Sequence, residues 1–246
     1  MSARLFAGRF EELLGAARVA EIEAAMTDEA TILLAGDPAT GKTSVARRLA
    51  EYLESTADGT GALVRRMAAE AGVSLADFNA RLESRPETDH ALDAAAALAI
   101  ARGEAVVFES RLAGHLGSWL RRRGRRGLVT VYLTCAPAWQ ARRLVAREGG
   151  AALAAVVDTA LIADPAATSS LEGCAAILRG LGAPEASRAA ALLDVEASRA
   201  SEDRGRMRRR YGVSLDDPEV YDVVLDTTES TIDEVARLVL EHPPMR

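Results

Sequence analysis

The chain has 246 residues with a formal net charge of −6, and 49% of them are hydrophobic. Such a composition is typical of a globular protein, and the acidic balance argues against nucleic acid as a main partner. Two cysteines and three histidines at wide spacing argue against a disulfide framework or a thiolate metal site, and no apolar segment reaches the roughly 20 residues of a membrane helix. Because Arg9, Glu11 and Glu12 stand where a secretory signal would be apolar, we expect a cytoplasmic protein without a membrane partner.

The first elements in chain order are a helix, a strand and a second helix. Residues 9–27 are rich in Ala and Glu and predict an amphipathic helix ahead of the core. Residues 31–35 (TILLA) are apolar and β-branched, which predicts a strand, and the amphipathic run from Ser44 onward predicts a helix. The segment between them, GDPATGKT at 36–43, fits Gly-x4-Gly-Lys-Thr, the loop that binds the phosphates of nucleoside triphosphates.

This phosphate loop predicts a site for ATP. Backbone N–H groups and the N-terminus of the following helix surround the anion, Lys42 reaches the β- and γ-phosphates, and Thr43 offers a hydroxyl to Mg²⁺. Lys42 is also the only lysine among the 30 basic residues, which a functional requirement explains better than chance survival in an arginine-rich chain. The predicted ATP-binding residues are Gly36, Asp37, Pro38, Ala39, Thr40, Gly41, Lys42, Thr43 and Ser44.

The remaining elements alternate between helices and strands. Further helices are predicted at 62–72, 74–84 (with Ser74 as its N-cap), 87–102, 138–148, 196–210 and 231–241. Further strands are predicted at 105–108, 128–134 and 222–226. The Ala-rich segment 149–195 indicates several short helices, with breaks at Asp164-Pro165, Gly180 and Pro184. This alternation predicts an α/β doubly wound fold with its ligand at the carboxyl ends of the strands.

The charged helix at 196–210 carries a candidate anion site. Arg199, Asp203 and Arg206 are spaced i, i+4 and i+7, so they share one face, with Asp203 between the two guanidinium groups. Two oriented guanidinium groups suit a multiply charged phosphate. From the spacing alone, a solvated surface helix laced with salt bridges is the commoner explanation, and the anion site gains support only from the other segments of the chain.

Several of these segments resemble the shorter, archaeal type of cytidylate kinases. They occur in that family's order over 29–148 and 196–240, and they include the helix with Arg199. The segments are GDPATGKTSVARRLAEYL, TGALVRRMAAEAGVSLADFNARLE, PETDHALD, VVFESRLAGHL, VYLTCAP and YGVSLDD followed by YDVVLDT. The resemblance implies an α/β P-loop NTPase fold of three α/β/α layers, with a five-stranded parallel sheet as in adenylate kinases, an NMP-binding region and a helical lid.

The same resemblance implies a division of the chain. Residues 1–28 form an N-terminal helical extension in this scheme, and 29–246 form the kinase domain. Within that domain, the core comprises 29–54, 103–144 and 211–246, the NMP-binding region comprises 55–102, and the lid with its helical insertion comprises 145–210.

The function that the resemblance implies is that of a nucleoside monophosphate kinase, which transfers the γ-phosphoryl group of ATP to CMP or dCMP with Mg²⁺. The implied catalytic residues are Lys42, Arg111, Arg199, Asp203 and Arg206. The implied acceptor-binding residues are Thr60, Gly61, Arg65, Asp89 and Arg111. Thr43 would hold Mg²⁺ mostly through water and phosphates, and Glu109 would hold a Mg²⁺-bound water or serve as a structural acid at its strand end.

Departures from the family keep other functions open. The segment 149–195 is longer than expected for the family, the N-terminal helix is extra, and Ala62 stands where the family commonly has an acidic residue. The alternatives are a kinase for another small phosphorylated or anionic metabolite, and an ATP-binding regulatory protein whose insertion docks a partner. Two separate arginine clusters argue against a pure binding protein. We expect a monomer or a weak dimer.

Other polar residues have plainer explanations. Asp89 and Asp93, one turn apart, also fit exposed helix aspartates. The run RRRGRR at 121–126 fits a solvated turn or a patch that faces an acidic partner. Cys135 and Cys174 fit packing positions rather than nucleophiles.

Overall fold

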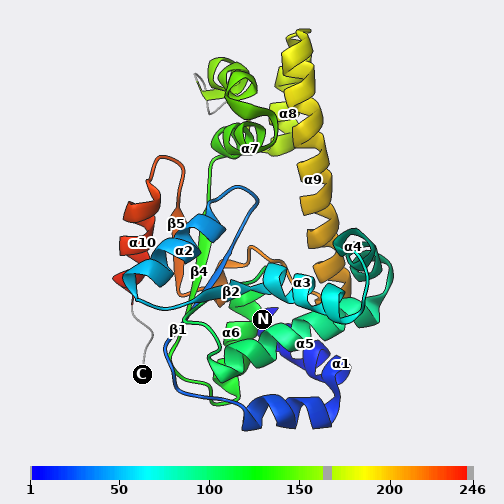
Figure 1. Cartoon of the computed structure of the whole chain (residues 1–246), viewed down its shortest axis with the longest axis vertical. Coiled ribbons are helices and arrows are strands. Elements are labelled where there is room, and N and C mark those ends of the chain that lie inside the picture. Colours follow the sequence, from blue (N-terminus) through cyan, green and yellow to red (C-terminus); the bar gives the residue numbers. More distant parts are fainter. Residues whose placement is uncertain (1, 163–167, 243–246) are drawn as a thin grey trace.

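In the computed structural model, which describes residues 2–162 and 168–242, five parallel strands form one sheet in the order β2-β3-β1-β4-β5 (Figure 1). The strands are β1 (Thr31–Gly36), β2 (Ala57–Gly59), β3 (Val107–Glu109), β4 (Leu128–Thr134) and β5 (Val223–Asp226). Helices cover both faces of the sheet, so the predicted three-layer α/β/α fold is confirmed.

Alternate residues of β1 pack into different cores on the two faces of the sheet. Ile32 and Leu34 belong to one core, whereas Leu33 and Ala35 belong to the other. The first core includes α2 (Lys42–Tyr52) and α10 (Ile232–Leu240), and the second includes α5 (Pro86–Arg102) and α6 (Ala113–Arg122). A strand covered on both faces needs a continuous apolar sequence, which is why β1 and β4 were predictable.

Strand β2 and helix α6 are absent from the sequence-based predictions. The three residues of β2 (Ala57–Gly59) lie in a Gly- and Thr-rich segment for which no strand was predicted, yet they pair in parallel with β3. Such a short edge strand has no apolar run to identify it. The adjacent helices α3 (Thr60–Glu70) and α4 (Leu75–Ser84) were predicted, and the Ser74 side chain accepts a hydrogen bond from the Asp77 N–H as an N-cap does.

The N-terminal helix α1 (Ser2–Ala24) begins earlier than predicted and contains a non-helical residue, Gly15, at φ 73° and ψ 157°. Phe6 and Phe10 are fully buried in the core shared with α5 and α6. The Phe10 ring lies 5.1 Å from Trp119 and 6.0 Å from Tyr211, both edge-on. The helix is therefore part of the main core rather than an appendage.

The arginine run at 121–126 is a solvated turn only in part, because Arg122 and Arg126 are exposed whereas the other arginines are half-buried or buried. Arg122 donates to the Ala3 carbonyl, and Arg123 pairs with Glu11 and Glu23 of α1. Arg125 is 1% exposed and donates to the Glu29 carbonyl. Much of this positive charge is thus used to attach α1 and the start of β1 to the domain.

A second, separate hydrophobic core lies in the segment between β4 and the last strand. It is formed by α7 (Pro137–Val157), η1 (Asp158–Ile162), α8 (Leu171–Gly180) and the first half of α9 (Pro184–Tyr211). The predicted helix at 196–210 is only the second half of α9, which runs from this bundle to α5 and α1 (Figure 1). The breaks predicted at Gly180 and Pro184 are confirmed, and the one at Asp164-Pro165 lies outside the described residues.

Two features complete the fold. A short turn of 3-10 helix, η3 (Pro218–Val220), precedes β5, and α10 begins with a capping box between Thr231 and Glu234. None of the described helices is long and apolar enough to cross a membrane.

Candidate functional site

The phosphate loop connects the carboxyl end of β1 to the N-terminus of α2, as predicted. Gly41 has a left-handed backbone with φ 88° and caps α2, and Gly36 has φ 147°. A Cβ atom at position 36 would lie 2.3 Å from the Leu133 carbonyl oxygen, so only glycine fits there. These glycines let backbone N–H groups at the start of α2 face a common point, which is the geometry of an anion site.

Lys42 points back into the loop. Its Nζ donates to the carbonyl oxygens of Gly36 at 2.8 Å and Asp37 at 2.6 Å. Burial lowers the pKa of Lys42 to about 8, although the nearby carboxylates of Glu109 and Asp37 oppose this effect. The ammonium is thus already desolvated in the place where a phosphate would meet it.

The Thr43 hydroxyl donates to Glu109 Oε2 at 2.9 Å. Glu109 ends β3, next to the loop, and burial raises its pKa. A hydroxyl and a carboxylate are ligands that suit Mg²⁺, so this pair fits the predicted metal position. In the described part of the chain, no group of three or more His, Cys, Asp or Glu residues could hold a metal ion by itself. The pair could therefore hold Mg²⁺ only together with water and phosphate oxygens.

A cavity of about 480 Å³ joins the phosphate loop to helix α9. It lies between α3, α4, the end of β3 and α9, and it contains many of the predicted catalytic and acceptor residues. Among its lining residues are Lys42, Thr60, Gly61, Glu109, Arg111, Arg199, Asp203 and Arg206. Arg65 lines a neighbouring cavity of about 600 Å³, which shares Gly61 and Glu109 with the first.

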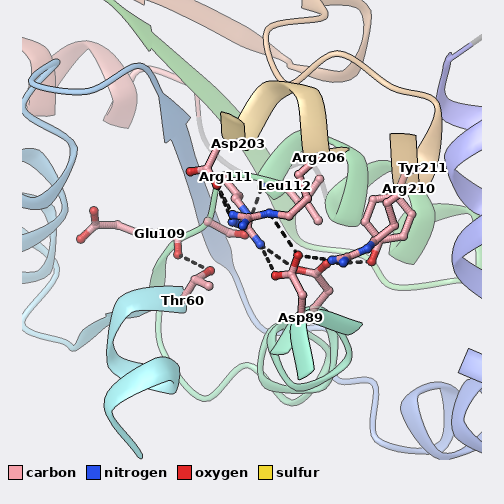
Figure 2. A network of polar contacts seen from close by, with 11 residues as sticks. Thr60, Asp89, Glu109, Arg111, Leu112, Asp203, Arg206, Arg210 and Tyr211 are labelled. Carbon is pink, nitrogen blue, oxygen red and sulfur yellow. Dashed lines mark hydrogen bonds and ion pairs between the residues drawn. The ribbon is translucent and has the colours of Figure 1, made fainter. Parts of the chain in front are cut away.

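Arg111 and Arg206 are held beside this cavity by a network of carboxylates (Figure 2). Arg111 donates to Asp89 Oδ1 at 2.5 Å and to Asp203 Oδ1 at 3.2 Å. Arg206 pairs with Asp203 and lies 3.3 Å from Asp89 Oδ2, and Arg210 also donates to Asp89 Oδ2. One buried carboxylate thus contacts three guanidinium groups.

Asp89 and Asp93 are not the exposed helix aspartates of the alternative interpretation. Asp89 is 0% and Asp93 is 2% exposed. Asp93 Oδ2 accepts a hydrogen bond of 2.7 Å from the Tyr211 hydroxyl, and burial raises the pKa of Asp93 to about 6. Asp89 does not line the cavity itself, and it contacts Arg111 and Arg206, which do.

The predicted arrangement of the lid arginines is correct only in part. Arg199 lines the cavity, but its side chain is 70% exposed and pairs with Glu196 rather than Asp203. Asp203 instead links Arg206 to Arg111, so it does not lie between the two lid arginines. The reason is that Arg111, far away in sequence, offers a closer cation than Arg199 does.

Sequence reasoning missed Arg210 and Tyr211. Arg210 follows Arg206 by one helical turn, so the i, i+4 pattern that selected Arg206 extends to it. The sequence analysis also gave no role to Arg143. This residue donates to the Thr227 carbonyl at 2.5 Å and to the Ala39 carbonyl at 3.3 Å. Arg143 lines a third cavity, of about 490 Å³, on the α10 side of the phosphate loop.

The comparisons with known proteins agree with this geometry. Residues 32–154, half of the chain, match the model of the AAA domain family. The chain belongs to the AAA domain family. The matched range of this AAA domain includes the phosphate loop, Glu109 and Arg111, and it ends before α9.

Curated relatives extend the similarity over most of the chain. The cytidylate kinase of Pyrobaculum aerophilum is 29% identical over 213 residues, which cover 86% of this chain and 91% of the relative. That of Aeropyrum pernix is 29% identical over 209 residues, 85% of this chain and 96% of the relative. That of Methanosarcina acetivorans is 41% identical over 85 residues, 35% of this chain and 47% of the relative. The resemblance to cytidylate kinases is thereby confirmed.

The fold of this AAA domain also occurs in a solved structure. A crystal structure of an uncharacterized protein from Eubacterium ventriosum has a TM-score of 0.52 and 12% identity, and the match covers 87% of this chain and 98% of that one. At this identity the match concerns the fold alone.

Proposed function

We propose that the protein is an ATP-dependent nucleoside monophosphate kinase that phosphorylates CMP or dCMP. The observation that carries this proposal is one cavity that Lys42 of the phosphate loop shares with Arg111 and Arg206. A donor phosphate at Lys42 and an acceptor phosphate at the two arginines would face each other across this cavity. The similarity to cytidylate kinases supports cytosine as the base.

The donor phosphates bind the loop of residues 36–44, where backbone N–H groups and Lys42 offset their charge. The third cavity, beside Arg143, offers room for the adenosine part of ATP. Mg²⁺ supplies charge neutralisation on the phosphates, and Thr43 and Glu109 are the residues that would hold it, directly or through water.

Arg111 and Arg206 bind and orient the acceptor phosphate. Without the acceptor, the Asp203 carboxylate contacts the guanidinium groups of both arginines. The acceptor phosphate takes the place of this carboxylate when it binds. The acceptor oxygen is already anionic, and no protein general base is needed. Catalysis by the chain then consists of positioning the two phosphates and stabilising the charge that spreads over the transferred group.

A second candidate is a kinase for another small phosphorylated metabolite. The observation that favours it is the separate core of α7, α8 and α9, which gives the lid a size and rigidity of its own. An ATP-binding regulatory protein is the third reading, and the two arginines that face the acceptor position speak against it. We propose a monomer or a weak dimer for the kinase.

The test is ADP release from Mg·ATP with CMP, dCMP, UMP, AMP and GMP offered separately. Turnover confined to the cytosine nucleotides supports the proposal, provided that Lys42→Ala and Arg111→Ala abolish it. Arg188→Ala, an exposed position on α9, is the matched arginine control and keeps wild-type rates. Turnover with a different phosphorylated metabolite would support the second candidate. ATP binding without turnover on any acceptor, and without an effect of Arg111→Ala, would support the third.

A further inference from the structure

Helix α4 brings two polar side chains, Asn79 and Glu83, to the cavity that Lys42 shares with Arg111 and Arg206. The two residues stand four positions apart, so their side chains lie on the same face of α4, one turn from each other. Both are exposed, and both line this cavity of about 480 Å³. A ligand that fills the cavity therefore contacts them.

Asn79 and Glu83 are available to such a ligand. In the part of the chain that the structure describes, no hydrogen bond or ion pair joins either side chain to another residue. The other polar residues of the lining already have partners. Examples are the hydrogen bonds of Thr60 with the Glu109 carbonyl and of Ser110 with the Leu112 N–H, and the ion pair of Arg199 with Glu196. The amide of Asn79 and the carboxylate of Glu83 thus keep their hydrogen-bonding capacity for what binds in the cavity.

Aliphatic side chains from three helices line the same cavity. Leu82 of α4 and Leu92 of α5 are buried, and Val64 of α3 is half-buried. A few polar groups among apolar side chains are typical of a site for a planar ring, because the ring faces pack against the apolar side chains while the ring edges meet the polar groups. This side of the cavity therefore suits the base of the acceptor.

The charge of Glu83 restricts which base fits. An ionised carboxylate only accepts hydrogen bonds, and it repels a ligand that carries a phosphate unless that ligand offers it a donor. Cytosine has an amino group at C4, which donates, whereas uracil, like thymine, has a carbonyl oxygen there, which accepts. The carboxylate therefore favours cytosine and disfavours uracil. Asn79 differs, since an amide both donates and accepts and can bind the edge of either base.

We propose that Glu83 determines the base specificity of the kinase. Its carboxylate accepts a hydrogen bond from the 4-amino group of cytosine, and Asn79 binds the neighbouring edge of the ring. With UMP in the same position, the carbonyl oxygen at C4 faces the carboxylate, so two acceptors meet and neither is paired. The ligand class is that of 4-aminopyrimidine nucleotides. This inference rests on the proposed kinase function and adds to it the residue that selects the base.

The first test is the kinetics of CMP and UMP phosphorylation. In Glu83→Gln the new amide can turn its NH2 group toward the uracil oxygen, so we expect the ratio of kcat/KM for CMP to that for UMP to fall by about tenfold or more. Asn79→Ala should lower both kcat/KM values by about fivefold or more and leave their ratio within about twofold. Glu70→Gln, exposed at the end of α3 and outside the cavity lining, is the matched control and keeps the ratio. A wild type that uses CMP and UMP equally well, or an unchanged ratio in Glu83→Gln, would overturn the inference.

Equilibrium binding separates this inference from the proposed function. Calorimetry measures the affinities of the wild type and Glu83→Gln for CMP and for UMP without ATP. The affinity of Glu83→Gln for Mg·AMP-PNP should equal that of the wild type, which shows that the variant folds. A preference for CMP that Glu83→Gln removes supports the inference even for a protein that transfers no phosphate. Turnover without a preference that depends on Glu83 contradicts the inference alone, whereas a wild type that neither binds nor phosphorylates CMP contradicts both.

Discussion

Arg111 Nη2 donates to Asp89 Oδ1 over 2.5 Å, and Asp89 is fully buried on α5. Since Arg206 and Arg210 reach the other oxygen of the same carboxylate, Asp89 joins the loop after β3 to helix α9. Arg111 and Arg206, which line the cavity that also contains Lys42, are thereby fixed relative to each other. In this arrangement Asp89 holds the three arginines in position.

The substitution Asp89→Asn should therefore impair acceptor binding. It keeps the shape of the side chain but removes the negative charge that three guanidinium groups share, so the arginines lose their common anchor. We expect the KM of the acceptor to rise by about tenfold or more, with little change in the affinity for Mg·AMP-PNP. Glu87→Gln removes one charge from an exposed position of the same helix and should change neither. Equal losses of acceptor and donor affinity would contradict the positioning role.

The phosphate loop was fully predictable, whereas this carboxylate network was not. A contiguous motif encodes the loop, because its glycines, lysine and threonine act within eight residues. The network assembles Asp89, Arg111 and Arg206 from three distant segments, and helical spacing says nothing about such contacts. For this reason the sequence predicted that Asp203 lies beside Arg199, whereas in the structure Asp203 accepts a hydrogen bond from Arg111.

The pKa of Lys42 predicts how ATP binding depends on pH. Burial lowers this pKa to about 8 without nucleotide, and a bound triphosphate stabilises the ammonium and raises the pKa again. Above pH 8 the free protein has therefore lost a proton that the complex retains, so binding takes up a proton. We expect the affinity for Mg·AMP-PNP to fall by up to about tenfold per pH unit above pH 8.

Calorimetry in buffers of different ionisation enthalpy measures this proton uptake directly. Lys42→Ala should bind the analogue weakly and with a flat pH dependence over the same range, because the titrating group is gone. A wild-type affinity that stays constant from pH 7 to pH 10 would show that the ammonium does not govern binding.

The position of α1 leads to a prediction about stability. Phe10 is fully buried and contacts both Trp119 of α6 and Tyr211 at the end of α9. Phe10→Ala should lower the free energy of unfolding by about 3–5 kcal/mol, because it leaves a cavity at this junction. Leu13→Ala, at a position of the same helix that is 48% exposed, should cost much less. Denaturant unfolding measures both, and similar losses would mean that α1 is only loosely attached.

The sequence could not predict how extensively α1 packs against the rest of the domain. The amphipathic pattern predicted the helix but not its ionic contacts with the 121–126 run. An arginine-rich run is typical of a solvated surface, so the sequence gave no sign that Arg123 pairs with Glu11 and Glu23. Strand β2 was not predicted for a different reason. Its backbone pairs with β3, but its residues do not form the apolar run by which a strand is identified. Local patterns thus identified β1 and β4 from their apolar sequences, but they could not show contacts that distant segments supply.

The pair of Thr43 and Glu109 predicts how the reaction depends on Mg²⁺. Glu109→Gln retains an oxygen that can accept the Thr43 hydrogen bond but removes the charge that attracts a divalent cation. We expect the Mg²⁺ concentration for half-maximal rate to rise several-fold, on the order of tenfold, while binding of metal-free AMP-PNP stays the same or improves. Glu104→Gln, exposed just before β3, is the matched control. Because burial raises the pKa of Glu109, its carboxylate is protonated more readily as the pH falls, so the wild type should also require more Mg²⁺ at acidic pH. If the Mg²⁺ requirement of Glu109→Gln is unchanged, Glu109 does not hold the metal and is instead a structural acid that orients Thr43.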